Sequence, residues 1–532
     1  MKHSLSVPIA VAISAVLWLL GTGLHPYPGI VALAPLPVLL IASRVSSWVA
    51  FTAGFGSWLL GAIPFIPYFS STLEQPPLPS ILLLGVTATT YAGLIALTST
   101  LIRRGRPGSA VLALPAGWVL MEYLISIAAP FGAWWSLAYT QADVLPVIQV
   151  AALTGRLGIS FLILLVPTVA AILIDVTVPR RSRIRCAAVA LTVLIAVGGY
   201  GFWQLSGPAG RDPVPVALLA VTQPEDYVPV DSADGRDMIT RAVAEIDRLA
   251  DRGARIVVLP EKSWRATEST LPMLSGPLSE VAVRRNVDVI AGLIFTRGGT
   301  AINAAIDFPS GLVYAKHHLV PGLESASSAG TELTRLPGTS WALAVCFDLD
   351  FPDLVRANRN HGASLLLVPA LDFRKDHWLH SRMAVLRGVE SGLGTARAAQ
   401  LGDLVLSDAH GRILASSNTD ITLTRSVLAD IPQPAGPTVY ARFGDWFAAA
   451  AALLLAIAVL GTFRNRDTTS TAIPRLGVAG VAIDPAQIKG GAPVAAGAVA
   501  RRPAGPGQPG ESAQGGIAHQ TGIPLRLRKR GQ

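Results

Sequence analysis

The distribution of apolar residues along the chain limits its fold more than any other feature. Apolar stretches crowd residues 1–205, a more polar segment covers 206–442, and one last apolar stretch covers 443–463. A run of about 20 apolar residues can cross the hydrocarbon core of a bilayer. The chain is only 14% charged, whereas about 25% of the residues in an average soluble domain are charged. We therefore predict a membrane protein that carries a water-facing domain.

Eight membrane spans are predicted, seven before the polar segment and one after it. The second is short and contains Pro35 and Pro37. The first is not interpreted as a cleaved signal peptide, because it lacks a small-residue cleavage site and further spans follow at once. The predicted spans lie near residues 6–23, 28–43, 48–69, 80–102, 109–129, 157–177, 186–205 and 443–463.

Basic residues sit in short runs beside these spans, and they predict the orientation of the chain. The formal net charge is +9, and loops on the cytoplasmic side carry an excess of Lys and Arg. With the N-terminus in the cytoplasm, these runs all lie inside and the loop 70–79, which has no Lys or Arg, lies outside. The basic runs are Arg103, Arg104 and Arg106, then Arg180, Arg181, Arg183 and Arg185, then Arg464 and Arg466. This topology places 206–442 on the extracytoplasmic face of the plasma membrane and both termini in the cytoplasm. The same placement of charge argues against a nucleic-acid partner.

The polar segment predicts a soluble α/β domain. Short apolar runs rich in β-branched residues alternate with amphipathic stretches such as 238–253, where Gly253 is a candidate C-cap. This alternation favours an α/β sandwich. The predicted strands are 214–221, 254–260, 287–295, 341–347 and 363–369. The remaining tail, 464–532, is rich in Gly, Ala and Pro, ends in a basic run, and is predicted to be disordered.

The chain has two cysteines, Cys186 and Cys346. Cys186 follows a basic run at the edge of an apolar span and is interpreted as structural. Cys346 ends an apolar run at the start of a predicted helix, where backbone N–H groups favour a thiolate and can stabilise an oxyanion. A lone cysteine is more often a small buried hydrophobe, so this position alone does not indicate catalysis.

Glu261 and Lys316 also follow apolar runs. A carboxylate at a strand end can act as general base toward a thiol, and an ammonium can stabilise the oxyanion of an acyl-transfer intermediate. For each residue alone, a surface position is the simpler interpretation. His317 and His318 invite a Cys–His pairing, but neighbouring side chains of an extended segment point in opposite directions. We expect both histidines to be structural, and we expect no metal site, because no ligand cluster has the necessary spacing.

Taken together, the order Glu261, Lys316, Cys346 resembles the nitrilase, or carbon–nitrogen hydrolase, superfamily. The resemblance extends to LPEKSW around Glu261, to Asn303 followed by VYAKHHLVP around Lys316, and to VCFDLDFPDLVR and HSRMAVLRGVESG around and after Cys346. In the apolar half, PFGAWWSLAYTQAD (130–143) and QVAALTGRLGISFL (149–162) resemble the membrane region of apolipoprotein N-acyltransferases. The plan of seven spans, nitrilase domain and final span is similar too.

This resemblance implies a four-layer αββα nitrilase-like domain on a helical membrane unit. It implies that an acyl chain moves from a phospholipid, through a Cys346 thioester, to the α-amino group of a diacylglyceryl-cysteine lipoprotein. Glu261 would be the base and Lys316 would stabilise the tetrahedral intermediates. Glu324 matches a further family glutamate, the Phe347 N–H is a candidate oxyanion donor, and Asp348 stands where the family has Glu. The resemblance implies no cofactor, and we expect a monomer.

The sequence departs from the family pattern around the predicted site. Phe347 and Asp348 replace Tyr and Glu, VPGLE (320–324) replaces Val-Pro-Phe-Gly-Glu, and the segments 370–376 and 396–403 lack the usual Asn-containing signatures. Two alternatives therefore stay open beside the acyltransferase. One is a membrane-bound amidase or acyltransferase with another acceptor. The other is a degenerate homologue that binds lipid or partner proteins, although intact Glu261, Lys316 and Cys346 argue against it.

Overall fold

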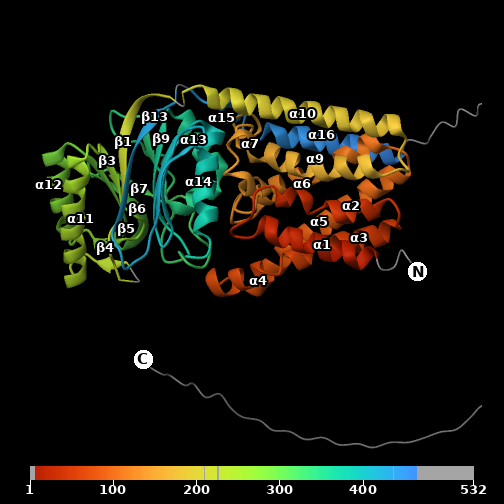
Figure 1. Ribbon diagram of the computed structural model, residues 1–532. Coiled ribbons are helices and arrows are strands. Elements are labelled where there is room, and N and C mark those ends of the chain that lie inside the picture. Colours follow the sequence, from red (N-terminus) through yellow and green to blue (C-terminus); the bar gives the residue numbers. More distant parts are fainter. Residues whose placement is uncertain (1–5, 209, 225–226, 435, 464–532) are drawn as a thin grey trace, which may run out of the picture. The chain divides into compact units, whose positions relative to one another are not determined.

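Apolar helices form the N-terminal half of the structure, a computed structural model that describes residues 6–208, 210–224, 227–434 and 436–463. These helices pack on one another and on the last helix of the described chain (Figure 1). The predicted tail, 464–532, lies outside the described residues. The helices are α1 (Ser6–Thr22), η1 (Ile30–Leu33), α2 (Leu36–Ala42), α3 (Ser47–Gly61), α4 (Phe65–Pro67), η2 (Tyr68–Thr72), α5 (Pro77–Arg103), α6 (Pro107–Ala128), η3 (Leu137–Gln141), α7 (Leu145–Ile148), α8 (Ala151–Thr154), α9 (Arg156–Ile174), α10 (Arg180–Ser206) and α16 (Trp446–Phe463).

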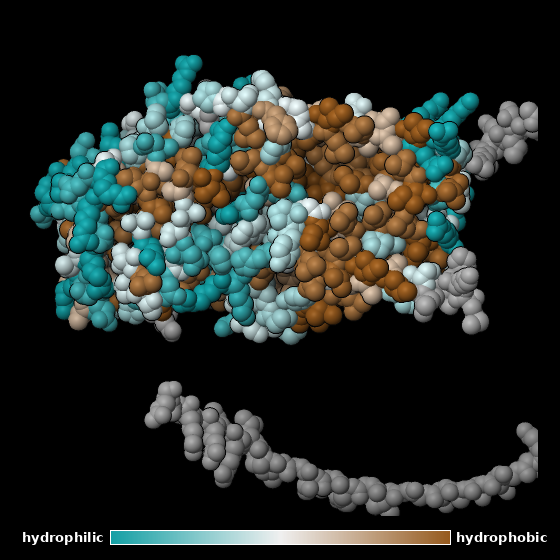
Figure 2. Space-filling view, in the orientation of Figure 1, coloured by the Kyte–Doolittle hydropathy of each residue, from teal (hydrophilic) through white to brown (hydrophobic). Residues whose placement is uncertain are grey.

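Five described helices, α5, α6, α9, α10 and α16, are long and apolar enough to cross a membrane. A sixth span results if α3 and the Phe65–Thr72 segment, which meet at a 53° bend, count as one. α1 is shorter, with 17 residues. Figure 2 shows a hydrophobic surface over this half of the molecule, bounded by hydrophilic residues at both ends. Large apolar side chains such as Ile195, Phe202 and Leu460 are exposed there, as expected for helices that face lipid.

The structure differs from the prediction at residues 28–43. In place of one helix it has the 3-10 turn η1 and the seven-residue helix α2. Gly29, with φ +81°, precedes the turn, and Pro35 and Pro37 interrupt the segment. Proline has no N–H to donate to a preceding turn, so these residues break the predicted span. At about 1.5 Å per residue, α2 is far shorter than the bilayer core.

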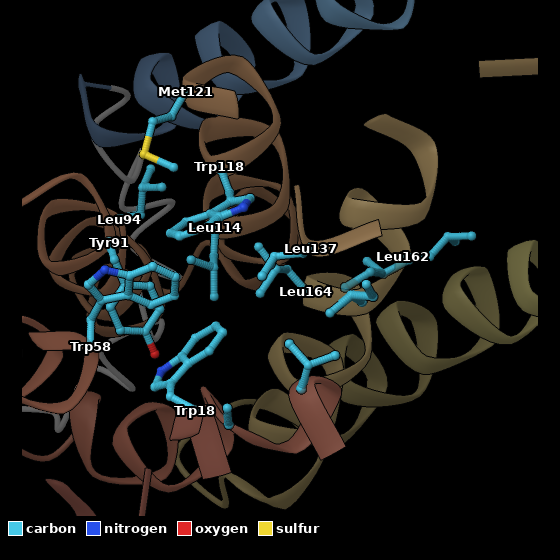
Figure 3. Packing of buried hydrophobic residues seen from close by; sticks show 14 of the residues in the cluster. Trp18, Trp58, Tyr91, Leu94, Leu114, Trp118, Met121, Leu137, Leu162 and Leu164 are labelled. Carbon is cyan, nitrogen blue, oxygen red and sulfur yellow. The ribbon is translucent and has the colours of Figure 1, made fainter. Parts of the chain in front are cut away.

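Aromatic side chains from four helices form the centre of the helical unit (Figure 3). Trp58 of α3 meets Trp18 of α1 at 4.6 Å and Trp118 of α6 at 4.7 Å, both edge to face. Tyr91 of α5 closes the group at 5.4 Å from Trp18. Such pairs contribute about 0.5–1.5 kcal/mol each beyond the area they bury. They hold together helices that are distant in the sequence.

Glu122 of α6 fixes the segment that follows this helix. Its carboxylate accepts hydrogen bonds from Ser136 Oγ at 2.8 Å, Leu137 N at 2.9 Å and Ser160 Oγ at 2.8 Å. Trp118 Nε1 donates a fourth at 2.8 Å. A buried carboxylate is tolerated only with such partners. The bonds hold residues 130–137 in place, and this segment packs against the other half of the protein.

Residues 211–433 form two stacked sheets between two helix layers, so the αββα sandwich predicted from the family resemblance is confirmed. The larger sheet has the order β13-β1-β3-β5-β4-β2, with β6 on β5 and β7 on β6, and the smaller has the order β12-β11-β10-β9-β8. Apolar side chains between the sheets form one core, and those beneath α11 and α12 form another. The strands are β1 (Arg211–Ala220), β2 (Val228–Pro229), β3 (Ile256–Val258), β4 (Trp264–Thr267), β5 (Asp288–Arg297), β6 (Thr300–Phe308), β7 (Val313–Ala315), β8 (Trp341–Leu343), β9 (Leu365–Leu371), β10 (Gly394–Gln400), β11 (Asp403–Ser407), β12 (Ile413–Asn418) and β13 (Arg425–Gln433).

The second helix layer lies between the smaller sheet and the helical unit (Figure 1). Its helix α14 contacts β10 and β11 on one side and α8 and η3 on the other. All five predicted strands are present, although β8, ahead of Cys346, is only three residues long. The helices of this domain are α11 (Ala233–Asp251), α12 (Pro272–Arg285), η4 (Cys346–Asp350), α13 (Pro352–Asn360), α14 (His377–Ser391) and α15 (Val439–Phe443).

Two contacts between the halves lie close to the end of η4. Ala133 N donates a 2.7 Å hydrogen bond to the backbone oxygen of Asp350, and Tyr68 Oη donates one of 2.5 Å to Asp376 Oδ2. Gly132 allows this close approach: it has φ +55°, and a Cβ there would lie 2.5 Å from the Asp350 oxygen. The helical unit and the turn after Cys346 are therefore locked together.

We expect Gly132→Ala to destabilise the protein by about 1–3 kcal/mol more than Gly29→Ala, because it adds overpacking to the backbone strain. Gly29 is the matched control: its φ is +81°, but nothing lies within 4 Å of a Cβ there. Thermal unfolding of the two variants in detergent measures the difference. Equal melting temperatures would contradict the close contact between Gly132 and Asp350.

Candidate active site

Glu261 lies just beyond the carboxyl end of β3, and its side chain is only 2% exposed. Its Oε1 accepts hydrogen bonds from Lys316 Nζ at 2.8 Å and Asn303 Nδ2 at 2.5 Å. Its Oε2 accepts the N–H of Leu371 at 3.0 Å. β3 of the larger sheet and β9 of the smaller sheet both end here, so an edge of each sheet lies beside Glu261. Glu261 is therefore held by groups from both sheets.

Lys316 follows β7 and lies between two carboxylates. Its Nζ is 2.8 Å from Glu261 Oε1 and 2.9 Å from Glu324 Oε2, and the side chain is 1% exposed. Burial alone would lower the pKa of Lys316, but its electrostatic interactions with Glu261, Cys346 and Glu324 raise this pKa above its ordinary value. The ammonium therefore stays charged, and its interaction with Cys346 places it within electrostatic reach of the thiol.

Glu324, on the loop after Lys316, is also part of this cluster. It accepts the N–H of Val320 at 2.8 Å and pairs with Lys262 at 2.6 Å. Burial would raise the pKa of Glu324, but Lys316 and Lys262 lower it to about 2. The altered sequence VPGLE therefore still delivers a glutamate to the site.

Cys346 is the first residue of η4, directly beyond β8, and its backbone has φ +42°. A non-glycine residue in this region costs about 1–3 kcal/mol and is characteristic of functional sites. Sγ donates to the Leu371 carbonyl oxygen at 3.6 Å, while the N–H of the same Leu371 binds Glu261. The backbone of one residue, Leu371, thus contacts both the thiol and the carboxylate.

The expected thiolate at Cys346 is wrong for this resting state. Burial is the main reason that the pKa of the thiol lies well above its ordinary value, and the charge of Glu261 adds to the effect. Lys316 and Arg397 oppose it without overcoming it. A sulfur nucleophile here therefore requires a base to remove its proton.

Asp348, two residues after Cys346, is buried and stabilises the turn. Its carboxylate accepts hydrogen bonds from Tyr314 Oη at 2.7 Å, Val345 N at 2.9 Å and His318 N at 2.9 Å. The side chain is one methylene shorter than the glutamate of the family but still reaches these donors. The ring of His317 stacks on Tyr314, and the ring of His318 stacks on Phe351. Both rings therefore pack on aromatic side chains, in agreement with a structural role.

Glu261, Lys316 and Cys346 line one cavity of about 650 Å³. Phe347 and Glu324 line it too, and Phe347 packs edge to face on Phe351. The helical unit also contributes to the lining, mainly with apolar residues, among them Phe69, Leu83, Pro130, Phe131 and Trp134. The cavity therefore combines a charged cluster from the αββα domain with apolar residues from the membrane half.

Sequence reasoning assigned no role to several charged or polar residues of this cavity. Lys262 and Asn303 bind the carboxylates of the site directly. Arg397 forms a two-fold ion pair with Asp372, at 2.8 and 2.5 Å. Lys262 could have been found from the sequence because it directly follows Glu261, and Asn303 because it belongs to the motif around Lys316. The Arg397–Asp372 pair joins β10 to the end of β9, and only the fold reveals it. Within the described ranges no group of three or more His, Cys, Asp or Glu side chains could hold a metal ion.

Two family models match the chain. The apolipoprotein N-acyltransferase N-terminal domain matches residues 14–169, and the carbon–nitrogen hydrolase family matches residues 216–430. Together they cover well over half of the chain. These ranges correspond to the helical unit and to the αββα sandwich.

Individual proteins match over most of the chain as well. An apolipoprotein N-acyltransferase from Geobacter metallireducens is 27% identical over 83% of this chain and 93% of that protein. One from Bradyrhizobium diazoefficiens is 28% identical over 82% of this chain and 93% of that protein. Among solved structures, an amidase from Nesterenkonia sp. has 19% identity and a TM-score of 0.36, over 46% of this chain and 98% of that chain.

The sandwich, with a cysteine on a strained turn beside a buried carboxylate and ammonium, defines a carbon–nitrogen hydrolase domain. Its attachment to a unit of apolar helices makes the whole a membrane protein. The chain belongs to the apolipoprotein N-acyltransferase family.

The pKa of Glu324 predicts how stability depends on pH. It is about 2 in the folded protein against an ordinary value of 4.5, so ionised Glu324 stabilises the fold above about pH 4.5. This contribution is lost as the pH falls toward 2. We expect Glu324→Gln to cost about 3–5 kcal/mol at pH 7, because it breaks a buried ion pair.

The difference in melting temperature between wild type and Glu324→Gln should therefore shrink as the pH is lowered from 4.5 to 2. Glu332→Gln is the control, since Glu332 is exposed on the same segment. A difference that stays constant over this pH range would contradict the ion-paired state of Glu324.

Proposed function

We propose that this protein transfers a fatty acyl chain from a phospholipid, through a thioester on Cys346, to the α-amino group of the diacylglyceryl-cysteine that begins an apolipoprotein. The observation that carries the proposal is the shared cavity. Cys346, Glu261 and Lys316 line it together with apolar residues of the helical unit. A water-soluble amidase has no need of such a wall, whereas a lipid acyl chain does.

In the first half-reaction Glu261 is the general base. It takes the proton of the Cys346 thiol as Sγ attacks the ester carbonyl carbon of the phospholipid. The ester C–O bond then breaks, and Glu261 returns the proton to the leaving oxygen, which departs as the lysophospholipid. The raised pKa of the thiol makes this base necessary, and the link through Leu371 supports its placement.

Lys316 and the Phe347 N–H stabilise the oxyanion of each tetrahedral intermediate. A fixed ammonium is effective in a site that excludes water, because it needs no reorganisation when charge develops. Glu324 holds Lys316 in position, Lys262 pairs with Glu324, and Asp348 holds the turn that carries Cys346 and Phe347. These are supporting roles, since these side chains position the catalytic groups.

In the second half-reaction the lipoprotein amine attacks the thioester carbon, the C–S bond breaks and an amide forms. This order is a ping-pong mechanism. Both substrates are anchored in a bilayer, which explains a catalytic domain tethered to membrane helices. The relatives that share the N-acyltransferase name match both halves of the chain, which favours this function over another acceptor. The complete buried cluster argues against a degenerate lipid-binding homologue.

We expect intact-mass analysis after incubation with phospholipid to show a gain of one acyl chain that hydroxylamine removes. Cys346→Ala should form no adduct, while Cys186→Ala, the matched control, should react like wild type because Cys186 lies on α10. An adduct that persists in Cys346→Ala would remove Cys346 from the mechanism. Glu261→Gln should slow the formation of the adduct by at least about a hundredfold, within the range of general base catalysis.

The proposed enzyme acts as a monomer, with the catalytic domain 206–442 outside the plasma membrane and both termini in the cytoplasm. This orientation predicts the labelling of single cysteines in intact cells, in a background where both native cysteines, Cys186 and Cys346, are replaced by alanine. Thr240→Cys, on an exposed site of α11, should react with a membrane-impermeant maleimide. Thr177→Cys, exposed between α9 and α10, should react only after the cells are lysed. The reverse pattern would invert the topology.

A further inference from the structure

Asp350, the last residue of η4, is a buried carboxylate that the mechanism above does not use. It lines the same cavity as Cys346, and its side chain is only 1% exposed. Neither carboxylate oxygen has a hydrogen-bond partner among the described residues. A buried carboxylate without a partner is costly, so its presence in a substrate cavity calls for a ligand.

The backbone of Asp350 is fixed from both halves of the protein. η4 begins at Cys346, and the Ala133 N–H binds the Asp350 carbonyl oxygen at 2.7 Å. In a 3-10 helix with about 2 Å rise per residue, Asp350 and Cys346 stand roughly 8 Å apart along the axis. The carboxylate and the nucleophile therefore belong to one rigid segment and open into one cavity.

The charges around Asp350 leave this carboxylate without a cation. The cations that act on it each face another carboxylate: Lys316 faces Glu261 and Glu324, Arg397 faces Asp372, Arg387 faces Glu390, and His380 lies 3.5 Å from Asp372 and 3.6 Å from Asp376. Burial would lower the pKa of His380, but Asp376 and Asp372 raise it, so His380 is engaged as a cation as well. One positive charge is missing, and its place is at Asp350.

We propose that Asp350 binds a primary ammonium group of a substrate in this cavity and accepts a proton from it. The inference rests on the proposed function and adds to it the site that recognises the amine. An ammonium has three N–H donors, which suit a carboxylate with both oxygens free. The buried carboxylates Glu261, Glu324 and Asp372, which also line the cavity, already face cations, so Asp350 is the one of these with both oxygens free for a charged amine.

The proton affinity of Asp350 suits this task. Burial raises its pKa to about 7, against the opposing charges of His380, Arg387, Arg397 and Lys316. An ordinary α-amino group has a pKa of about 7.7–8.0. A proton therefore passes between the two at little cost, and a neutral amine, the only form that can attack a thioester, becomes available inside the cavity.

The proton balance of the second half-reaction then closes. Asp350 takes one proton from the ammonium, and the neutral nitrogen forms a bond to the thioester carbon. Glu261 takes a second proton from this nitrogen, the C–S bond breaks, and Glu261 returns that proton to the Cys346 sulfur. Asp350 releases its own proton to solvent. The amide product carries no charge, so it loses the Asp350 interaction and can leave.

A primary ammonium is found on the lipoprotein acceptor and also in the ethanolamine headgroup of a phospholipid donor. The experiment separates these sources by following the two half-reactions in the full-length protein. Adduct formation is measured with phosphatidylethanolamine and with phosphatidylglycerol. Transfer is then measured from the isolated acyl-enzyme to a synthetic diacylglyceryl-cysteine peptide with a free α-amine.

The informative variants are Asp350→Asn, which keeps the shape, and Asp350→Ala, which removes the same charge. Glu74→Gln is the control, because Glu74 is an exposed carboxylate on the rim of the same cavity. If the ammonium belongs to the lipoprotein acceptor, we expect both Asp350 variants to form the adduct within twofold of wild type with both donors. They should then transfer the acyl chain at least tenfold more slowly than wild type. A tenfold loss of adduct formation with phosphatidylethanolamine alone supports the same ammonium site with the headgroup as its ligand. Glu74→Gln should match wild type in every measurement.

The proposal is overturned if both steps stay within twofold of wild type in both Asp350 variants. It is also overturned if both variants lose adduct formation equally with the two donors, because the residue would then serve the fold or the acylation chemistry. Failure of the acyltransferase function itself has a separate signature, since wild type would then form no adduct with either phospholipid.

Discussion

The site depends on one buried ammonium. Lys316 lies between Glu261 and Glu324, within 2.9 Å of an oxygen of each, and is the shared partner of these two buried side chains. Removing one member of such a cluster leaves an uncompensated charge, which is far more costly than the loss of a surface pair. Asn303 and Lys262 complete the arrangement by binding the same carboxylates. Because the groups fix one another, the residues proposed as base and oxyanion-stabilising cation are in place before a substrate arrives.

The nucleophile is positioned by strain and kept inactive by burial. The positive φ of Cys346 turns its thiol into the cavity, and Asp348 holds the turn through Tyr314 and two backbone N–H groups. The raised pKa keeps the sulfur protonated, so the resting enzyme is protected against unwanted reactions of a thiolate. In the proposed mechanism, the sulfur reacts only when Glu261 takes its proton and a carbonyl carbon has entered the cavity.

The helical unit is part of the active site as well as its anchor. Phe69, Phe131 and Trp134 supply the apolar wall, while Ala133 and Tyr68 bind groups beside the catalytic turn. Glu122 organises the same segment from within the bundle. The cavity therefore exists only because both halves are assembled. Asp350 stands at the junction, where it can meet an amine that arrives from the membrane.

Hydropathy, the order Glu261, Lys316, Cys346 and the short apolar runs were enough to predict a membrane protein with an αββα domain, because periodicity and span length are local properties of the chain. The break at residues 28–43 could have been expected from Pro35 and Pro37, since proline acts on its own turn. The state of the thiol could not be predicted: the N-terminal position of Cys346 on a helix favours a thiolate, but burial and Glu261 outweigh it. The unpaired Asp350 could not be predicted either. Its isolation depends on which carboxylate each nearby cation faces. Pairs such as Lys316 with Glu261, 55 positions earlier, and Arg397 with Asp372, 25 positions earlier, form only when their strands are assembled, so the tertiary structure decides them.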